Sequence, residues 1–184
     1  IESTEYYGAT GCIERVEWNC EYEEGEDAPL KHIVFYNAAG EIVRIERMPG
    51  EQPRQIEYYQ DGQLVRIELF NAGDELEYTQ YYDEQNRMRK REMYDGNGRL
   101  EKEFNYDERE HLTSEVWRLR SGKKTVDQYE KGRKVRTEFF DRRDRLEKIC
   151  YYNRDGVMTS CEKYGDGGEL LTADSIQTAY DATA

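Results

Sequence analysis

The sequence predicts an all-β protein, an antiparallel β-meander of tandem strand–turn units of about 12 residues. Three observations support this fold class along the 184 residues. Large apolar residues, mostly aromatic, recur at nearly constant steps, turn-forming residues follow them at a fixed distance, and charged and apolar residues alternate between the turns. Alternation with a period of two is the pattern of a β-strand, not of a helix. The recurring anchor residues are Tyr22, Tyr36, Met48, Tyr59, Phe70, Tyr82, Tyr94, Tyr106, Trp117, Tyr129, Phe140, Tyr152 and Tyr164.

Turn formers after each anchor predict a hairpin. The clearest example is residues 94–100, in which Asp95 follows the anchor Tyr94, then Gly98 and Leu100. In a three-residue loop built on a type I turn, the third residue must be left-handed, which glycine tolerates best. The loop 96–98 would place Tyr94 directly opposite Leu100. We expect turns centred near residues 39, 61, 97, 131 and 155, with structural turn glycines at Gly40, Gly62, Gly98, Gly132 and Gly156.

Some steps are one residue shorter. Gly62 and Gly132 come one place earlier in two steps of 11 residues, and Asp61 with Gly62 is typical of a two-residue type I′ loop. Removing one loop residue keeps the next anchor on the same face. The 11-residue steps that start at Met48 and Tyr106 have no such correction and stay unexplained by this pattern.

The composition favours a thin core. Hydrophobic residues make up 36% of the chain and charged residues 36%, whereas about 45–50% apolar residues are usual in globular domains. We expect one domain over residues 1–171, with irregular strands in 1–30 and regular ones in 31–171, followed by a tail or linker at 172–184. Both faces of the sheet would be partly wet, as a single twisted layer or an open roll.

The charge distribution disfavours some partners. The net charge is −13, and residues 1–80 carry 18 acidic and 6 basic residues. Nucleic acids and anionic membranes both select basic surfaces, so neither is expected as a partner. The basic run at 87–91 would be divided between the two faces of a strand. The chain begins at Ile1 with no leader, which favours a piece of a larger protein and leaves its localisation unknown.

The four cysteines are expected to be free thiols. If residues 154–156 form a three-residue loop, Cys150 lies opposite Ser160 and Cys161 faces the other way. If the loop has two residues, Cys150 and Cys161 are directly opposed, at a hydrogen-bonded pair where Cα atoms are farther apart. Cys12 and Cys20 would lie about 26 Å apart on one strand. A count of only two free thiols would overturn this register and point towards a secreted protein.

Nothing in the sequence favours catalysis, a metal or a cofactor. The common nucleophile, phosphate-loop and zinc-protease motifs are absent. His32 and His111 stand alone in the sequence, and no spacing brings either to a cysteine. Residues 95–98 contain alternating oxygen ligands, but the calcium-loop spacing fails at Leu100, so turn chemistry explains them better.

Short motifs resemble known strand arrays. Residues 94–100 together with Tyr106 and Asp107 resemble the YD repeats of Rhs-type toxin shells and teneurins. Residues 58–64 are similar to MORN-variant repeats of small antitoxin-like proteins. Both resemblances imply antiparallel arrays that enclose, scaffold or bind, without catalytic residues. The aromatic pairs at 58–59, 81–82 and 151–152 also resemble cell-wall or glucan-binding repeats, which carry Gly-Trp pairs that this chain lacks.

Two functional hypotheses follow. The first is a non-enzymatic structural or protein-interaction module, whose partner is another protein or other segments of a larger chain. The second is a carbohydrate-binding repeat domain, in which anchors from alternate strands form an aromatic ladder; the bland alternative is that each ring only covers its neighbour's aliphatic residue. The candidate ladder residues are Tyr59, Tyr82, Tyr94, Tyr106, Tyr129 and Tyr152.

Overall fold

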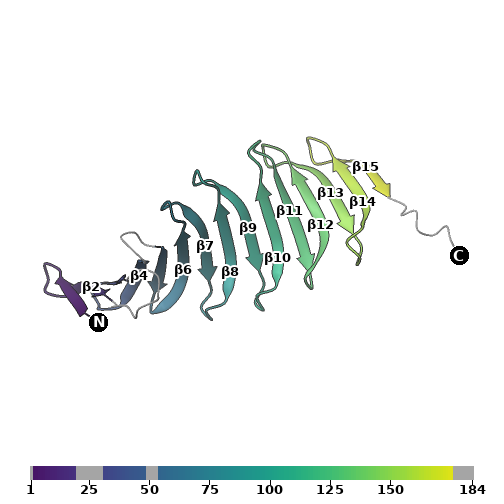
Figure 1. Cartoon of the computed structure of the whole chain (residues 1–184). Helices are drawn as coiled ribbons and strands as arrows, with labels where there is room; N and C mark the ends of the chain where they lie inside the picture. Colours follow the sequence, from purple (N-terminus) through teal and green to yellow (C-terminus); the bar gives the residue numbers. More distant parts are fainter. Residues whose placement is uncertain (1, 20–30, 49–53, 176–184) are drawn as a thin grey trace, which may run out of the picture. The chain divides into compact units, whose positions relative to one another are not determined.

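The protein folds as an antiparallel β-meander, as the sequence predicts. The computed structural model describes residues 2–19, 31–48 and 54–175, and the described residues contain fifteen strands and no helix. Each strand pairs with its neighbour along the chain in an open sheet (Figure 1). The strands are β1 (Glu2–Tyr7), β2 (Ile13–Asn19), β3 (Lys31–Tyr36), β4 (Ile42–Met48), β5 (Gln55–Gln60), β6 (Gln63–Phe70), β7 (Leu76–Tyr82), β8 (Met88–Tyr94), β9 (Leu100–Tyr106), β10 (Leu112–Arg118), β11 (Lys124–Glu130), β12 (Arg133–Phe140), β13 (Leu146–Tyr152), β14 (Met158–Tyr164) and β15 (Leu170–Ser175).

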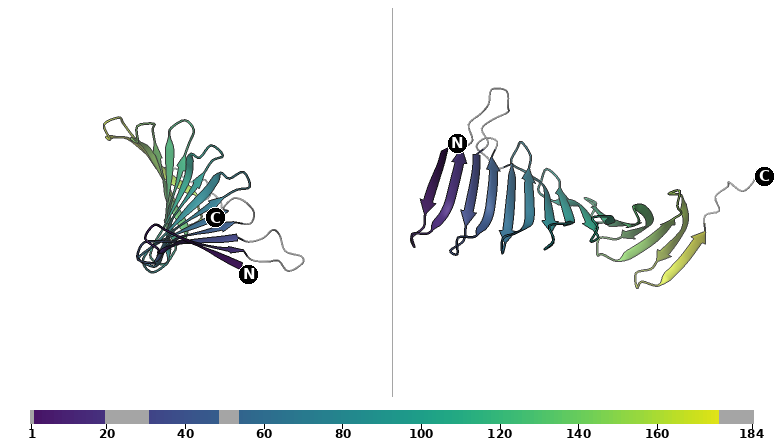
Figure 2. Two further views of the ribbon diagram at one scale, coloured as in Figure 1. Left: turned by 90° about the vertical axis from the view of Figure 1, so that its left-hand side faces the viewer. Right: turned by 90° about the horizontal axis from the view of Figure 1, so that it is seen from below.

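Contacts between residues divide the chain into two units. The first unit is Ile1–Arg99, with strands β1 to β8, and the second is Leu100–Ala184, with strands β9 to β15. Within each unit the described strands form a single layer, with no second sheet against either face (Figure 2). The last strand runs past the boundary that the sequence predicted at residue 171. The predicted anchor Tyr22 and Cys20 lie outside the described residues.

The turns have the expected three-residue form. In the turn after β8, the backbone N–H of Asp95 donates to the carbonyl of Arg99 at 2.9 Å, and that of Gly98 donates to the carbonyl of Asp95 at 2.8 Å. The Asp95 carboxylate also accepts the backbone N–H of Asn97 and Arg99. Asp and Asn are favoured at this place because a short acceptor satisfies the turn's own donors.

The two-residue loops are also present. Asp61 and Gly62 have φ values of 51° and 76°, and Lys131 and Gly132 have 51° and 75°. Two successive left-handed residues are the signature of a type I′ turn. Gly98 has a φ of 71° in a three-residue loop.

A bulge one pair beyond the turn is a feature that the sequence did not predict, and it occurs in most of the described hairpins but not between β10 and β11. Tyr82 pairs with Met88, as the anchor should, but the next pair inward is Tyr81 with Lys90, so Arg89 is the extra residue. A bulge of this kind places two residues opposite one and changes the register by one. The same one-residue shift follows the anchor in β3, β5, β6, β9, β11, β12, β13 and β14.

One anchor was assigned wrongly. The strand β10 ends at Arg118, which is 12 residues after Tyr106 and pairs with Lys124 at the turn. Trp117 lies one residue inward and pairs with Lys102. An arginine occupies the anchor place in this strand, so the 11-residue step moves to Arg118–Tyr129, where the hairpin has no bulge.

The core is as thin as the composition implies. Among the described residues, the buried hydrophobic side chains are few, and several polar side chains are buried beside them. Stability must therefore come from cross-strand neighbours within one layer. The buried hydrophobic residues are Val16, Ile33, Met48, Val116, Ile149 and Cys150, and the buried polar ones are Glu57, Thr79, Glu92 and Thr137.

Candidate functional site

The predicted aromatic ladder is divided between the two faces of the first unit. The hydroxyl of Tyr59 donates to Glu57 at 2.7 Å, and that of Tyr94 donates to Glu92 at 2.8 Å. The pairing register places Tyr59 and Tyr82 on one face and Tyr94 on the other. Tyr94 is therefore not part of one continuous ladder with Tyr59 and Tyr82.

In the second unit the ladder residues share one face but are occupied by internal contacts. Tyr129 donates to Glu115 at 3.0 Å, and the hydroxyl of Tyr152 lies 3.3 Å from the hydroxyl of Thr137. Tyr106 is half-buried at the end of β9. Burial, followed by the bond to Glu115, raises the pKa of Tyr129 to about 12. The hydroxyls of Tyr129 and Tyr152 therefore already have partners within the sheet.

A different row of side chains crosses the first unit. The pairing register aligns one residue from each of its eight strands, and aromatic and cationic residues alternate along the line. We call these residues the aromatic–cation row, and we call the face that carries it face A and the opposite face B. The aromatic–cation row consists of Tyr6, Arg15, Phe35, Arg44, Tyr58, Arg66, Tyr81 and Lys90.

Stacking contacts connect the members of the row within each hairpin. The guanidinium carbon of Arg44 lies 4.0 Å from the ring centroid of Phe35, and that of Arg66 lies 4.0 Å from the centroid of Tyr58. At this distance a cation over a ring is attracted by the ring quadrupole, at about 0.5–1 kcal/mol for exposed pairs. Because the cation comes from the neighbouring strand, it covers a face of the ring along the row.

Each cation of the row is paired with a carboxylate two residues further along its own strand. Arg44 pairs with Glu46 at 2.9 Å, and Lys90 pairs with Glu92 at 2.7 Å. The side chain of Arg44 is 38% exposed, whereas that of Glu46 is 14% exposed. The cations are therefore held in place by more deeply buried acids and remain partly accessible.

Glu92, one of these acids, has three hydrogen-bonding partners. It is buried and accepts hydrogen bonds from the hydroxyls of Tyr81 and Tyr94, each at 2.8 Å, besides its pair with Lys90. Burial alone would raise the pKa of Glu92, but the bonds from Lys90, Tyr94 and Tyr81 together lower it below its usual value. Glu92 is therefore a structural anion, held charged by three donors.

Glu57 has the same role on face B. It is buried and accepts from Arg47, Gln55 and Tyr59, each at 2.7 Å. Burial opposes its ionisation, yet the bonds from Arg47 and Tyr59 keep the pKa of Glu57 below its usual value. His32 lies 3.5 Å from Arg47, and burial followed by the charge of Arg47 lowers the pKa of His32. Neither group resembles an acid–base pair poised for catalysis.

The aromatic–cation row was missed in the sequence, although a signal exists. The residue just before an anchor is aromatic at Phe35, Tyr58 and Tyr81, and a cation follows eight or nine positions later. The spacing to the cation is irregular because the loops have two or three residues, and a bulge adds one residue to each. A register without bulges places the cation opposite a different residue.

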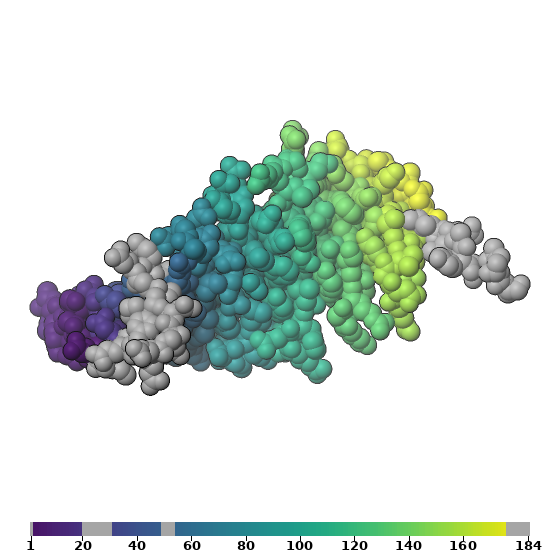
Figure 3. Space-filling model, in the orientation of Figure 1, coloured from purple at the N-terminus to yellow at the C-terminus, as the bar shows by residue number. Residues whose placement is uncertain are grey.

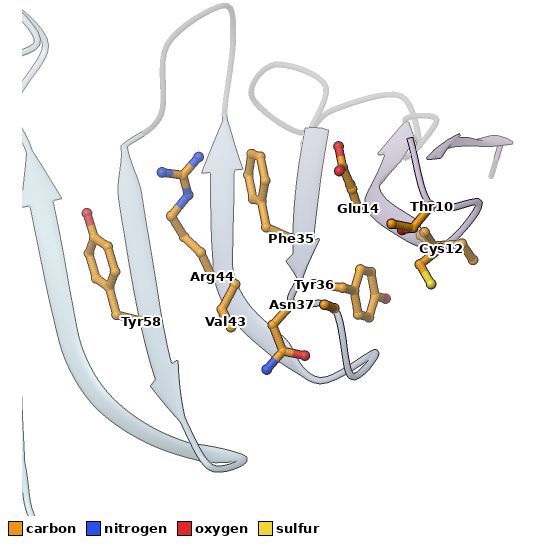
Figure 4. A pocket seen from close by; sticks show the side chains of 11 residues that line it. Thr10, Cys12, Glu14, Phe35, Tyr36, Asn37, Val43, Arg44 and Tyr58 are labelled. Atoms are coloured by element: carbon orange, nitrogen blue, oxygen red, sulfur yellow. The ribbon is translucent and has the colours of Figure 1, made fainter. Parts of the chain in front are cut away.

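A hollow lies beside the row at the turn end of β2 and β3 (Figure 4). Its volume is about 570 Å³, and Phe35, Arg44 and Tyr58 of the row contribute to its lining. Cys12 also lines it and is exposed and unbonded. The hollow offers a mixed aromatic and charged wall, and the described residues around it include no cluster of metal ligands.

The prediction of four free thiols is wrong. Cys150 and Cys161 form a disulfide across β13 and β14, with Cα atoms 4.2 Å apart. The loop has three residues, as one of the two alternatives required, but a bulge at Thr159 moves Cys161 into place opposite Cys150. Cys12 is a free thiol, and Cys20 lies outside the described residues.

The other candidate groups remain isolated. His111 lies 3.3 Å from Asp107 within its own turn, and Asp107 also accepts the backbone N–H of Arg109. No group of three or more His, Cys, Asp or Glu side chains that could hold a metal occurs in the described part of the chain. That same part contains no helix with the length and apolar character of a membrane span.

Comparisons with known proteins add no family. No family model matches the sequence, and no curated protein matches it. Solved structures with some likeness include S. aureus TarM, at 13% identity and a TM-score of 0.39 over 54% of this chain and 19% of that chain. The GtfA/B complex bound to UDP and GlcNAc is similar at 15% identity and a TM-score of 0.43, over 71% of this chain and 28% of that chain. A porin-like protein from Bacteroides uniformis has 11% identity and a TM-score of 0.24, over 87% of this chain and 94% of that chain.

Proposed function

We propose that this chain is a non-enzymatic structural or protein-interaction module, part of a larger protein or assembly. The observation that carries the proposal is the aromatic–cation row on face A. Tyrosine and arginine are the side chains most enriched where proteins bind one another. Here they lie in one line on an open sheet.

The row is pre-organised for docking. Arg15, Arg44 and Arg66 are each bonded to a glutamate of their own strand, and their side chains are 36–38% exposed. A side chain that is fixed before binding loses less conformational entropy when a partner covers it. A partner would therefore meet a stiff surface on which charge and aromatic area alternate.

The orientation of the rings favours a protein over a sugar. A sugar-binding platform presents an open ring face to the ligand, but a cation covers a face of Tyr6, Phe35 and Tyr58, each at 4.0 Å from its centroid. The carbohydrate-binding alternative stays as a second outcome of the test, because the hollow beside Tyr58 has an aromatic wall.

The test compares the two faces of the first unit. The variant Tyr58→Gln/Lys90→Ser changes the row, and the control Tyr78→Gln/Arg91→Ser removes a stacked pair at 4.1 Å on face B. Affinity capture with each protein, followed by binding measurements on the purified captured protein, should show loss only for the row variant. A glycan array run in parallel would overturn the proposal if it finds a sugar whose binding is lost with the row and no protein that binds.

A further inference from the structure

A second hollow lies at the turn edge of the second unit. It has a volume of about 420 Å³ and lies between the turn that joins β11 to β12 and the turn that follows β13. These turns form separate projections at the lower edge of the sheet (Figure 3). The lining residues are Glu130, Lys131, Arg133, Lys134, Val135, Tyr152, Asn153 and Arg154.

The polar groups around the hollow are mostly hydrogen-bond donors, with the carboxylate of Glu130 as the exception. Among the described residues, the side chains of Lys131, Arg133 and Arg154 make no ion pair or hydrogen bond with any other. The side-chain oxygen of Asn153 accepts the backbone N–H groups of Asp155 and Val157 within its own turn. The side-chain N–H₂ group of Asn153 is therefore available to a ligand. Three cations without a carboxylate partner around one hollow give it a positive charge that suits an anionic ligand.

Lys134 completes the lining in a different way. Its ammonium lies 4.7 Å from the ring centroid of Tyr152 and 3.6 Å from Asp127. One face of the Tyr152 ring is therefore covered by a cation. Lys134 also adds a positive charge to the lining of the hollow.

The first unit has strands and turns that correspond to those around the hollow, but acidic residues there replace some of the basic ones. Counterparts lie 70 positions apart, since Tyr59 corresponds to Tyr129 and Tyr82 to Tyr152. Lys131 corresponds to Asp61, and both have a φ of 51° in the same two-residue loop. The other counterparts are Gln63 for Arg133, Leu64 for Lys134, Asp83 for Asn153, Glu84 for Arg154 and Val65 for Val135, and Gln60 for Glu130 is the one pair in which the second unit is more acidic.

Turn chemistry does not explain this reversal. Aspartate is common in a left-handed position because its short side chain tolerates it, whereas lysine has no such advantage. The fold therefore accepts an acidic edge at this place. The basic edge in the second unit must have another cause.

We propose that this hollow binds a carboxylate-rich segment of the partner protein, held by Lys131, Arg133 and Arg154 with the amide of Asn153. The proposal rests on the proposed interaction function and specifies the chemistry of the partner. Guanidinium groups bind carboxylates through paired, charge-assisted hydrogen bonds. The acidic first part of the chain would repel such a partner and so direct it to the second unit.

The experiment uses the full chain and a fluorescein-labelled octaglutamate peptide. Fluorescence anisotropy at low ionic strength measures binding to the wild type, to K131Q/R133Q/R154Q, and to a control with three arginines changed on turns at the opposite edge, R120Q/R142Q/R143Q. Both variants lose the same charge, and circular dichroism verifies that both fold. We expect the first variant to weaken binding by about tenfold or more and the control by less than about twofold.

Two results would overturn the inference. Equal weakening in both variants would mean non-specific attraction to charge. Binding of a hexuronate oligosaccharide that depends on Lys131, Arg133 and Arg154, without binding of the peptide, would assign the hollow to an anionic sugar. Either result leaves the protein-interaction proposal for face A standing, because that proposal is tested on different residues.

Discussion

The two units use one framework for two different surfaces. Residues 55–94 of the first unit and 125–164 of the second correspond at a spacing of 70, and the anchors and turn glycines are retained at Tyr59 and Tyr129 and at Gly62 and Gly132. These residues fix the turns and the bulges. The residues between them are free to differ without changing the strands.

Face A shows the difference most clearly. In the first unit the row is complete, whereas in the second unit Gln128 replaces Tyr58 and Ser160 replaces Lys90. Arg136 and Tyr151 are retained. The comparison teaches that stability comes from the anchors and the buried acids, while the row is an added property of one unit.

The largest loss of stability should follow when the pair Cys150–Cys161 of β13 and β14 is replaced with the residue types found at the corresponding places of β7 and β8. Gln80 pairs with Arg91 in the register that Cys150 and Cys161 occupy in the second unit. The variant Cys150→Gln/Cys161→Arg should lose about 2–4 kcal/mol of unfolding free energy, because a disulfide restricts the unfolded chain. Urea denaturation without reductant measures the loss.

The reciprocal exchange serves as a control. The variant Gln80→Cys/Arg91→Cys should form a second disulfide and raise the denaturation midpoint. Thiol titration of the unfolded protein would then find no more free thiols than in the wild type. An increase of two free thiols would mean that the two units do not share this register.

Removal of a buried acid should have the next largest effect. Glu92→Ala leaves the hydroxyls of Tyr81 and Tyr94 without their acceptor and should cost about 2 kcal/mol. Glu162→Ala should cost less, because Glu162 accepts from Tyr151 and Tyr164 but Ser160 stands where the first unit has Lys90. Equal losses in urea denaturation would contradict the role given to the lysine.

The pH dependence of stability at the same site follows from the direction in which the pKa of Glu92 is shifted. The pKa of Glu92 is lowered in the folded state from an ordinary value of 4.5, so its contribution is complete above pH 4.5 and is lost as the pH falls through the lower folded value. The wild type should therefore lose stability below pH 4.5 more steeply than Glu92→Ala. Parallel curves for the two proteins would show that Glu92 is not the group responsible.

A turn glycine should have a smaller effect, and it has an internal control. Gly98→Val places a β-branched residue at a φ of 71° and should cost about 1–2 kcal/mol. Gly96, in the same loop, has no positive φ, and an added Cβ would meet only the Glu75 side chain at 3.7 Å. Gly96→Val should therefore change the melting temperature little. A loss equal to that of Gly98→Val would contradict the role given to the left-handed conformation of Gly98.

The smallest effect should come from the row itself. Lys90→Ser copies the second unit and removes a partly exposed ion pair, with an expected cost of about 0.5 kcal/mol. The reverse change, Ser160→Lys, places a cation directly opposite Tyr151 and near Glu162, and should stabilise by a similar amount. Urea denaturation in low and high salt would measure both, and salt should reduce the two effects.

The sequence predicted the fold class and the turns because both depend on local chemistry. Asp95 and Gly98 specify their loop within five residues, and the anchors repeat at the spacing of the strands. The bulges could not be predicted, because the extra residue differs from place to place, as Arg89 and Thr159 illustrate. Both the disulfide and the aromatic–cation row depend on those bulges, so the prediction failed for each for the same reason.

The order of the strands also bears on how such a chain can lengthen. Each strand pairs with its neighbours along the chain, so a copied hairpin enters the sheet beside the original without displacing distant pairs. Because strand direction alternates, a duplicated segment with an odd number of strands would exchange the faces of everything that follows. The 70-residue spacing carries β5 to β11, an even number of strands, and so preserves the sides. A duplication of whole hairpins therefore preserves the sides of the sheet, and the residues between the anchors can then differ from copy to copy.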